Sequence, residues 1–168
     1  PSFVYRDSRD LTGFVDGSAN PSLDEAPEEA TVPADRPGAG GSFALTMKFV
    51  HDLDAFDRLD VADQEHVFGR TKLDSVELDE KPDDAHISLA EVADADGDEL
   101  EVYRRSVPWA DAREQGLHFV SFGADLDRFD QQLRSIYGMT TPGTRDRLLS
   151  FTDAETGSFW FCPVSYTH

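Results

Sequence analysis

The run Ser42-Phe43-Ala44-Leu45-Thr46-Met47-Lys48-Phe49-Val50 predicts a β-strand, because it is apolar and is bounded by a glycine-rich loop. Asp52 follows directly and is a candidate N-cap for a helix. One side of that helix is apolar and carries Leu53, Phe56, Leu59 and Val67. Residues 1–20 before the strand are expected to be irregular or briefly helical, and residues 21–41 to form a surface loop rich in Pro, Gly and acidic residues.

After this first strand and helix, residues 69–98 form a long polar stretch that we expect to be mostly loop. Asp125 predicts the start of a second helix, with Gly138 as its stop and an apolar side made of Leu126, Phe129, Leu133, Ile136 and Tyr137. Further strands are expected at 99–107, 117–122 and 159–161, with a short helix around 144–149. The order β-α-loop-β-β-α-β predicts an α+β, ferredoxin-like fold, an antiparallel β-sheet with helices packed on one face.

Length and charge limit the function classes. The 168 residues suit one domain spanning 1–168, with residues 1–41 as its lead-in and loop, and 39% hydrophobic residues are enough for a folded core. No apolar run of about 18 residues predicts a membrane span, and no signal peptide is visible. The net charge of −19 argues against nucleic acid or anionic membranes as partners and resembles the surface of a halophilic protein.

The single cysteine, Cys162, lies in the aromatic run Phe161-Cys162-Pro163, and we expect it to be a buried structural residue. One thiol cannot form an intramolecular disulfide. This fits a reducing compartment and a cytoplasmic protein.

A carboxylate between glycines stands out in the lead-in, at Gly13-Phe14-Val15-Asp16-Gly17-Ser18. Glycines allow the backbone to approach a ligand closely. Asp16 is therefore either the cap of a turn or a working acid/base group, and this stretch alone leaves both interpretations open.

His86 lies inside the long polar stretch, within Pro82-Asp83-Asp84-Ala85-His86-Ile87-Ser88. A lone histidine is most often a surface or hydrogen-bonded residue. A neutral imidazole is also a standard axial ligand of haem iron, and a carboxylate on its other nitrogen raises its basicity.

An arginine pair closes the strand expected at 99–107, in Tyr103-Arg104-Arg105-Ser106-Val107-Pro108-Trp109. Strand alternation sends Arg104 and Arg105 to opposite faces of the sheet. The pair either forms salt bridges with the acidic surface or places one arginine in a pocket, where it would stabilise developing negative charge.

Taken together, the motifs around Asp16, His86 and Arg104 resemble those of dye-decolourising peroxidases, most closely the bacterial and archaeal B-type branch. The likeness runs through nearly the whole chain. Members of this family usually have two ferredoxin-like halves, and this chain is similar to the C-terminal, haem-binding half. Supporting stretches are His51-Asp52-Leu53, Gly69-Arg70-Thr71-Lys72, Gln131-Gln132-Leu133 and Arg145-Asp146-Arg147-Leu148-Leu149-Ser150-Phe151-Thr152.

The resemblance implies haem b as the cofactor. It implies His86 as the proximal ligand of the haem iron, Asp16 as the distal acid/base group and Arg104 as its distal partner. Ser106 matches a polar position near the distal pocket. Arg104 is chosen by counting back from the Ser-Val-Pro sequence, with Arg105 as the alternative.

The implied function is a haem-dependent peroxidase that reduces hydrogen peroxide and oxidises an organic electron donor. Leu89 departs from the family, which often has an arginine at this position. This departure and the missing N-terminal half motivate the alternative of a haem-binding or haem-trafficking module with little peroxidase turnover. A third reading is an interaction domain that binds no haem. The expected partners are hydrogen peroxide, an unknown reducing substrate, and either a second copy of the chain or the missing half.

Overall fold

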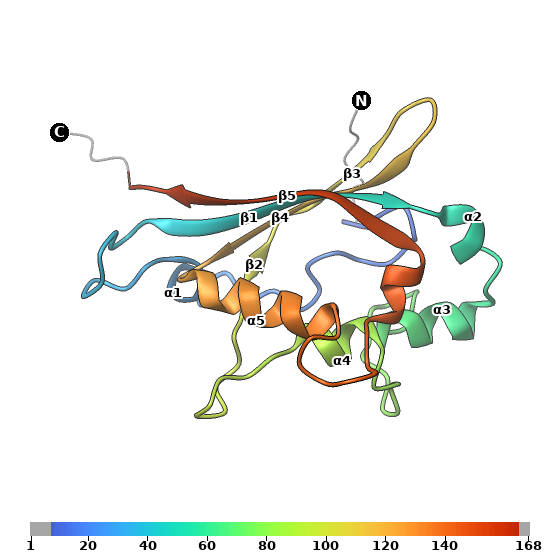
Figure 1. The fold of residues 1–168 in the computed structure, drawn as a ribbon, viewed down its shortest axis with the longest axis horizontal. Helices are drawn as coiled ribbons and strands as arrows, with labels where there is room; N and C mark the ends of the chain where they lie inside the picture. Colours follow the sequence, from blue (N-terminus) through green and yellow to red (C-terminus); the bar gives the residue numbers. More distant parts are fainter. Residues whose placement is uncertain (1–7, 165–168) are drawn as a thin grey trace.

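The computed structural model describes residues 8–164, and its main feature is a five-stranded antiparallel sheet (Figure 1). The strand order is β2-β4-β1-β5, with β3 also paired to β4. The central strand β1 pairs with β4 on one side and with β5 on the other. The strands are β1 (Ser42–His51), β2 (Tyr103–Arg104), β3 (Val107–Ala110), β4 (Gln115–Gly123) and β5 (Thr152–Cys162).

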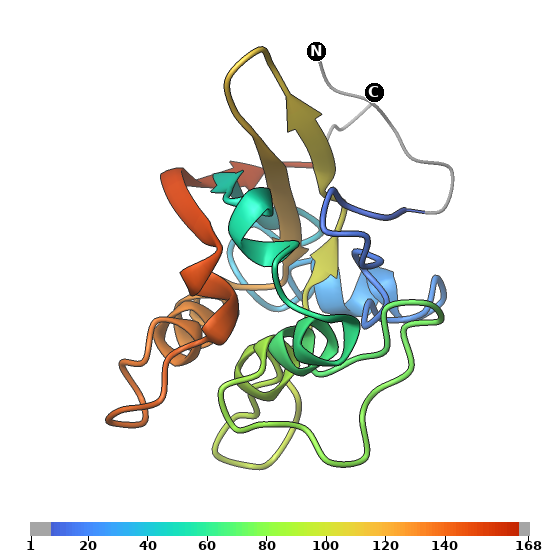
Figure 2. The same ribbon diagram turned by 90° about the vertical axis from the view of Figure 1, so that its right-hand side faces the viewer.

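The helices α3, α4 and α5 lie together on one face of the sheet, which confirms the predicted α+β class (Figure 1). Both views place the blue lead-in on this same side (Figures 1 and 2). Within residues 8–164, no helix is long and apolar enough to cross a membrane. The helices are α1 (Ala26–Ala30), α2 (Leu53–Phe56), α3 (Val61–Phe68), α4 (His86–Ala90), α5 (Leu126–Ile136) and the 3-10 helix η1 (Arg147–Ser150).

The helix expected after Asp52 forms as two short helices. The Asp52 side chain accepts a hydrogen bond from the Ala55 N–H at 2.9 Å and starts α2, which ends at Phe56. Asp60 then accepts from the Asp63 N–H at 2.9 Å and starts α3. A second N-cap inside the predicted helix thus restarts it, and the apolar pattern continues across the break.

The strand expected at 99–107 forms only in part: residues 99–102 lie outside any strand, β2 covers 103–104, and β3 begins at 107. The Arg105 N–H continues the pairing with β4 by donating to the Val120 carbonyl at 2.8 Å. The Ser106 N–H donates instead to the Asp16 carboxylate at 3.3 Å, and it lies in the gap between β2 and β3. The interruption therefore ties the lead-in to the sheet.

The last strand is much longer than the 159–161 expected, because residues 152–162 pair with β1 although the first seven of them are mostly polar. β5 is an edge strand, and every residue after Thr152 in it is exposed. Cys162 is therefore exposed, and the prediction of a buried cysteine was wrong.

Two apolar clusters hold the helices against the sheet. Leu45, Val102 and Phe129 are buried between the sheet and α5. Phe14, Phe56 and Val67 are buried where the lead-in meets α2 and α3. The lead-in is thus anchored by Phe14, two residues before Asp16. On α5 the apolar side is narrower than predicted, since Leu126 is 43% exposed and Tyr137 is 37% exposed.

Candidate functional site

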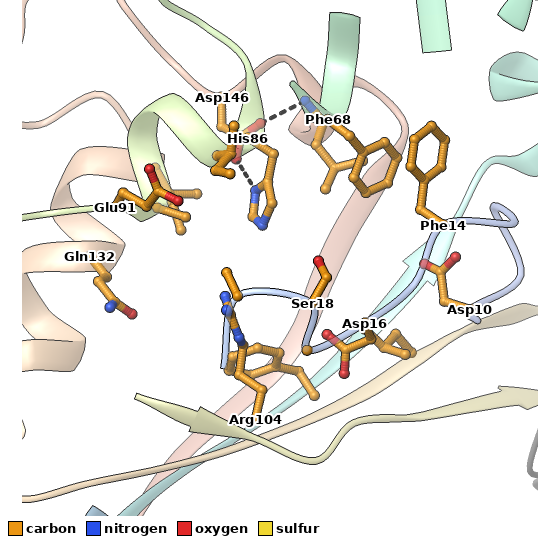
Figure 3. Close-up of a pocket in the computed structure, with 18 of the residues that line it drawn as sticks. Asp10, Phe14, Asp16, Ser18, Phe68, His86, Glu91, Arg104, Gln132 and Asp146 are labelled. Atoms are coloured by element: carbon orange, nitrogen blue, oxygen red, sulfur yellow. Dashed lines mark hydrogen bonds and ion pairs between the residues drawn. The ribbon is translucent and has the colours of Figure 1, made fainter. Parts of the chain in front are cut away.

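A pocket lies between the lead-in and β2 on one side and α4 on the other (Figure 3). The close-up shows the His86 ring pointing into the open space from the α4 side, with Asp16 and Arg104 on the opposite side. The pocket thus brings together three residues that the sequence analysis proposed from separate motifs. Most of the lining is apolar and includes Phe14, Met47, Phe49, Phe68, Ile87, Leu117, Phe119, Leu133 and Leu148.

His86 is the first residue of α4, and a contact at Nδ1 of its imidazole holds the ring in place. Its Nδ1 lies 2.6 Å from Oδ2 of Asp146, whose side chain is only 1% exposed. The Arg147 N–H donates to the Asp84 carbonyl at 2.9 Å, which ties the segment carrying Asp146 to the loop before α4. A carboxylate on Nδ1 directs the other nitrogen, Nε2, to serve as a ligand or acceptor.

Asp146 is a site residue that the sequence analysis did not identify. It was quoted only within a supporting stretch, and no residue was named as a carboxylate partner for His86. Its other oxygen, Oδ1, accepts from the Leu148 N–H at 2.8 Å and caps η1. A separation of 60 residues hides the pair from any local motif.

Asp16 is presented by a loop with two glycines in the left-handed region, Gly13 at φ 86° and Gly17 at φ 76°. Side chains rarely adopt such angles, so glycine is required there. The Asp16 carboxylate accepts from the Ser106 N–H, across 90 residues of sequence, at 3.3 Å. Asp16 therefore binds the segment between β2 and β3 rather than capping its own turn.

Arg104 and Arg105 face opposite ways, as strand alternation predicts. Arg104 lines the pocket, where burial lowers the pKa of its guanidinium and the negative charge of Asp16 acts in the opposite direction. The guanidinium of Arg105 lies over the Tyr103 ring, 5.1 Å from its centroid, and donates to the Tyr103 hydroxyl at 2.6 Å. The structure thus places Arg104, and not Arg105, beside Asp16.

The Asn20 side chain binds both the backbone N–H and the backbone carbonyl of Arg104. The Asn20 Oδ1 accepts from the Arg104 N–H at 2.8 Å and from its Nε at 3.4 Å. The Asn20 amide donates to the Arg104 carbonyl at 2.9 Å. The sequence analysis missed this residue, although one signal was available, since Asn20 is the only asparagine in the chain.

Ser106 contributes its backbone to the site. Its N–H contacts Asp16, but Ser106 is not among the residues that line the pocket. Its hydroxyl is buried and has no hydrogen-bond partner among residues 8–164. Across the same residues, no cluster of three or more His, Cys, Asp or Glu side chains could hold a metal ion.

Residues 7–167 match the family model described as "Dyp-type peroxidase, C-terminal". The chain belongs to this family. Among curated relatives, the dye-decolorizing peroxidase of Mycolicibacterium paratuberculosis is 40% identical, and the match covers 96% of this chain and 47% of the relative. The dye-decolorizing peroxidase of Mycobacterium tuberculosis is 38% identical over 96% of this chain and 50% of the relative. The Dyp-type chain therefore spans about half the length of these relatives.

Solved structures agree with the family assignment. A dye-decolorizing protein from V. cholerae shares 42% identity with a TM-score of 0.90, covering 96% of this chain and 54% of its own. A DypB variant from Rhodococcus jostii RHA1, solved in complex with heme, shares 37% identity with a TM-score of 0.92, covering 97% and 54%. These likenesses confirm the resemblance and the ferredoxin-like fold that the sequence predicted.

Proposed function

We propose that this Dyp-type domain binds haem b and uses it to reduce hydrogen peroxide with electrons from an organic donor. One observation carries the proposal. The imidazole of His86, held by Asp146 at 2.6 Å, faces Asp16 and Arg104 across an apolar pocket (Figure 3). The relative solved in complex with heme supports the same cofactor.

The pocket residues fit this cofactor. A single oriented imidazole suits an iron whose other ligands come from a macrocycle, and the apolar lining suits the macrocycle itself. The family often has an arginine where this chain has Leu89, which is 7% exposed and lies in the core. Arg70 lines the pocket and offers a cationic group for the haem carboxylates.

When bound, haem b would supply the redox-active iron on which peroxide is reduced. The Asp16 carboxylate would take a proton from one peroxide oxygen and return it to the departing oxygen, acting first as base and then as acid. The cationic Arg104 would stabilise the negative charge that develops as the O–O bond breaks. Asn20 would keep Arg104 in place for this role.

The stoichiometry of peroxide reduction sets how many electrons and protons must reach the pocket. Each hydrogen peroxide takes up two electrons and two protons and leaves as two waters. The organic donor supplies the electrons and is oxidised. The protons must enter the apolar pocket through its titratable side chains or through water.

A haem-binding module with little turnover is the second candidate, because the chain spans about half of its relatives. Haem-loaded protein mixed with peroxide and the chromogenic donor ABTS separates the two functions. A peroxidase oxidises the donor far faster than the same concentration of free haem. A module that binds haem in a one-to-one complex, but turns over no faster than free haem, would contradict the peroxidase proposal.

We also infer that the domain associates through the β5 side of the sheet, with a second copy or with a polypeptide equivalent to the N-terminal half of its relatives. Three neighbouring aromatic residues support this, with Phe159 51% exposed, Trp160 57% and Phe161 45%. Consecutive strand residues point to opposite faces, so these side chains expose apolar surface on both faces of an edge strand, which favours association. Light scattering of the purified chain should report a mass above one copy; a strict monomer would leave only the other half as the partner.

A further inference from the structure

The pocket wall contains a neighbouring carboxylate and imidazole that the proposed mechanism does not use. Asp10 of the lead-in and His51 at the end of β1 both line the pocket. Oδ2 of Asp10 lies 4.0 Å from Nε2 of His51, and the two side chains are 12% and 7% exposed. Figure 3 shows Asp10 and Asp16 on the same loop, on one side of the pocket.

The two oxygens of Asp10 have different surroundings. Oδ1 accepts from the Thr12 N–H at 2.8 Å and from the Thr12 hydroxyl. Oδ2 is the oxygen that faces His51. Burial raises the pKa of Asp10 to about 6, and the negative charge of Asp16 adds to the rise. Asp10 therefore holds a proton in mildly acidic solution, where an ordinary aspartate has lost it.

The hydrogen bonds of His51 define where its proton lies. Its Nδ1 is 2.8 Å from the Thr152 hydroxyl oxygen, and that hydroxyl donates to the Val50 carbonyl at 3.3 Å. A hydroxyl has one proton to give, so while Thr152 donates to Val50 it can only accept from an Nδ1–H of His51. Nε2 is then a bare acceptor, and it is buried with no hydrogen-bond partner within residues 8–164. Burial also lowers the pKa of His51 to about 4, so the ring is neutral.

This geometry can accommodate either protonation state of Asp10. When Asp10 is protonated, its O–H can turn toward the lone pair on Nε2, which lies 4.0 Å from Oδ2. When Asp10 is ionised, exchange with water can break the Nδ1–H bond and form an Nε2–H bond, which then faces the carboxylate. The Thr152 hydroxyl then turns from Val50 and donates to Nδ1. The second state stabilises the anion without adding a charge to the ring.

Other charged groups near Asp10 are engaged elsewhere, apart from Asp16. The Arg9 guanidinium donates to the carbonyls of Gly13, Lys72 and Leu73. The Lys72 ammonium donates to Oε1 of Gln64 at 2.6 Å. From the sheet, His51 is the titratable group that faces Asp10.

We propose that Asp10 and His51 form a proton relay that supplies protons to Asp16 while peroxide is reduced. This role rests on the proposed function, which consumes two protons for each peroxide. In each transfer the Asp10 O–H bond breaks and the Asp16 carboxylate gains the proton, directly or through pocket water. As Asp10 becomes an anion, His51 loses its Nδ1 proton to water and gains one from water at Nε2, so the ring stays neutral. Solvent then returns a proton to Asp10 and the tautomer reverts.

The tautomer change can be tested without turnover, in the full chain loaded with zinc protoporphyrin, which is diamagnetic and does not reduce peroxide. Nitrogen-15 NMR of the histidine rings should place the His51 proton on Nδ1 at pH 5 and on Nε2 at pH 8, with a crossover near pH 6. Asp10→Asn keeps an acceptor for Thr12 and should abolish the crossover. Thr152→Val should abolish it too, whereas Thr152→Ser retains the hydroxyl and should preserve it. One tautomer at both pH values, or a crossover that survives in Asp10→Asn, overturns the relay.

The role of the relay in turnover is tested in the haem-loaded chain with saturating peroxide and ABTS. The charge of ABTS is constant between pH 5 and 8. The wild-type kcat should fall as the pH rises through about 6. Asp10→Asn should lose this dependence and turn over on the order of tenfold more slowly at pH 5. Asp24→Asn, which removes an exposed carboxylate from the loop at residues 21–41, is the matched control and should behave as wild type.

The two experiments separate the relay from the proposed function. Without any wild-type turnover, the peroxidase proposal fails, and the proton-supply role fails with it, whatever the NMR result. With normal turnover and an unchanged pH dependence in Asp10→Asn, the peroxidase proposal stands and the relay is overturned. The relay stands only if the crossover and the loss of pH dependence are both observed.

Discussion

Oδ2 of Asp146 lies 2.6 Å from Nδ1 of His86, although 60 residues separate the two in the sequence. The carboxylate is buried, and its second oxygen caps η1 through the Leu148 N–H. Its position is therefore set by the fold before any ligand binds. The same contact orients the imidazole and directs Nε2 into the pocket, which is what a proximal haem ligand requires.

Replacing Asp146 by asparagine tests this contact. The amide keeps an acceptor for Leu148 but presents a neutral group to the imidazole. We expect haem affinity to fall on the order of 10- to 100-fold. The haem reduction potential should rise, because a less electron-rich imidazole stabilises the oxidised iron less. Haem titration and spectroelectrochemistry measure both. Asp153→Asn, at an exposed position on β5, is the control, and equal values in the two variants would contradict the role of Asp146.

Arg104 and Arg105 form a matched pair, since one lines the pocket and the other stacks on Tyr103 outside it. Arg104→Leu should slow the reaction with peroxide by about 10²- to 10³-fold, the usual cost of removing one charge-stabilising group. Haem binding should change much less. Arg105→Leu should leave the rate within about twofold, as expected for a surface change. Stopped-flow mixing with peroxide gives both rates, and equal losses would refute the assignment of Arg104.

The side chain of Asn20 forms two hydrogen bonds with the backbone of Arg104, at 2.8 and 2.9 Å. Asn20→Ala leaves these partly buried groups without partners. The free energy of unfolding should fall by about 1–3 kcal/mol. The peroxide rate should fall as well, because Arg104 loses its support. Urea unfolding measures the first effect. Gln131→Ala, which loses one exposed hydrogen bond to Asp127, is the control, and an equally small effect at both positions would exclude a positioning role for Asn20.

Asp10 and His51 predict opposing effects of pH on stability. Folding raises the pKa of Asp10 to about 6, so the folded chain holds a proton that the unfolded chain has lost between about pH 4 and 6. The free energy of unfolding therefore falls as pH rises through this window. Folding lowers the pKa of His51 to about 4, so His51 has the opposite effect between about pH 4 and 6.5. The two contributions largely cancel in the wild type.

Replacing Asp10 should reveal the effect of His51 on the pH dependence of the free energy of unfolding. Relative to wild type, the free energy of unfolding of Asp10→Asn should rise by about 3 kcal/mol between pH 4 and 6. Urea titrations of both proteins at several pH values measure this difference, in which the contributions of the other carboxylates cancel. If the free energies of unfolding of the two proteins changed in parallel with pH, Asp10 would titrate like an ordinary aspartate.

The fold was predictable as far as local patterns carry it. The run at residues 42–50 predicted β1, and Asp52 and Asp125 were correctly read as N-caps. β5 could not be predicted over most of its length, because polar residues such as Thr156 and Ser158 are strand residues only through their pairing with β1. The β2–β3 break depends on a hydrogen bond to Asp16, which no local pattern contains.

The candidate site also contains residues that the sequence predicted and residues that it did not. Asp16, His86 and Arg104 lie in short motifs with an unusual composition, and the structure gathers them around one pocket. Asp146 and Asn20 act through single contacts with residues 60 and 84 positions away. Such contacts follow from how the lead-in and η1 pack against the sheet and α4, which the sequence pattern alone does not specify.

Haem titration of the purified chain, followed by its absorption spectrum, tests the central claim most directly. The wild type, kept in high salt to screen its net charge of −19, should bind one haem and show a sharp, shifted Soret band. His86→Ala should lose or shift that band, and added imidazole should restore it, whereas His66→Ala, at an exposed position on α3, should match the wild type. A His86→Ala spectrum identical to that of the wild type would contradict His86 as the haem ligand and, with it, the proposed site.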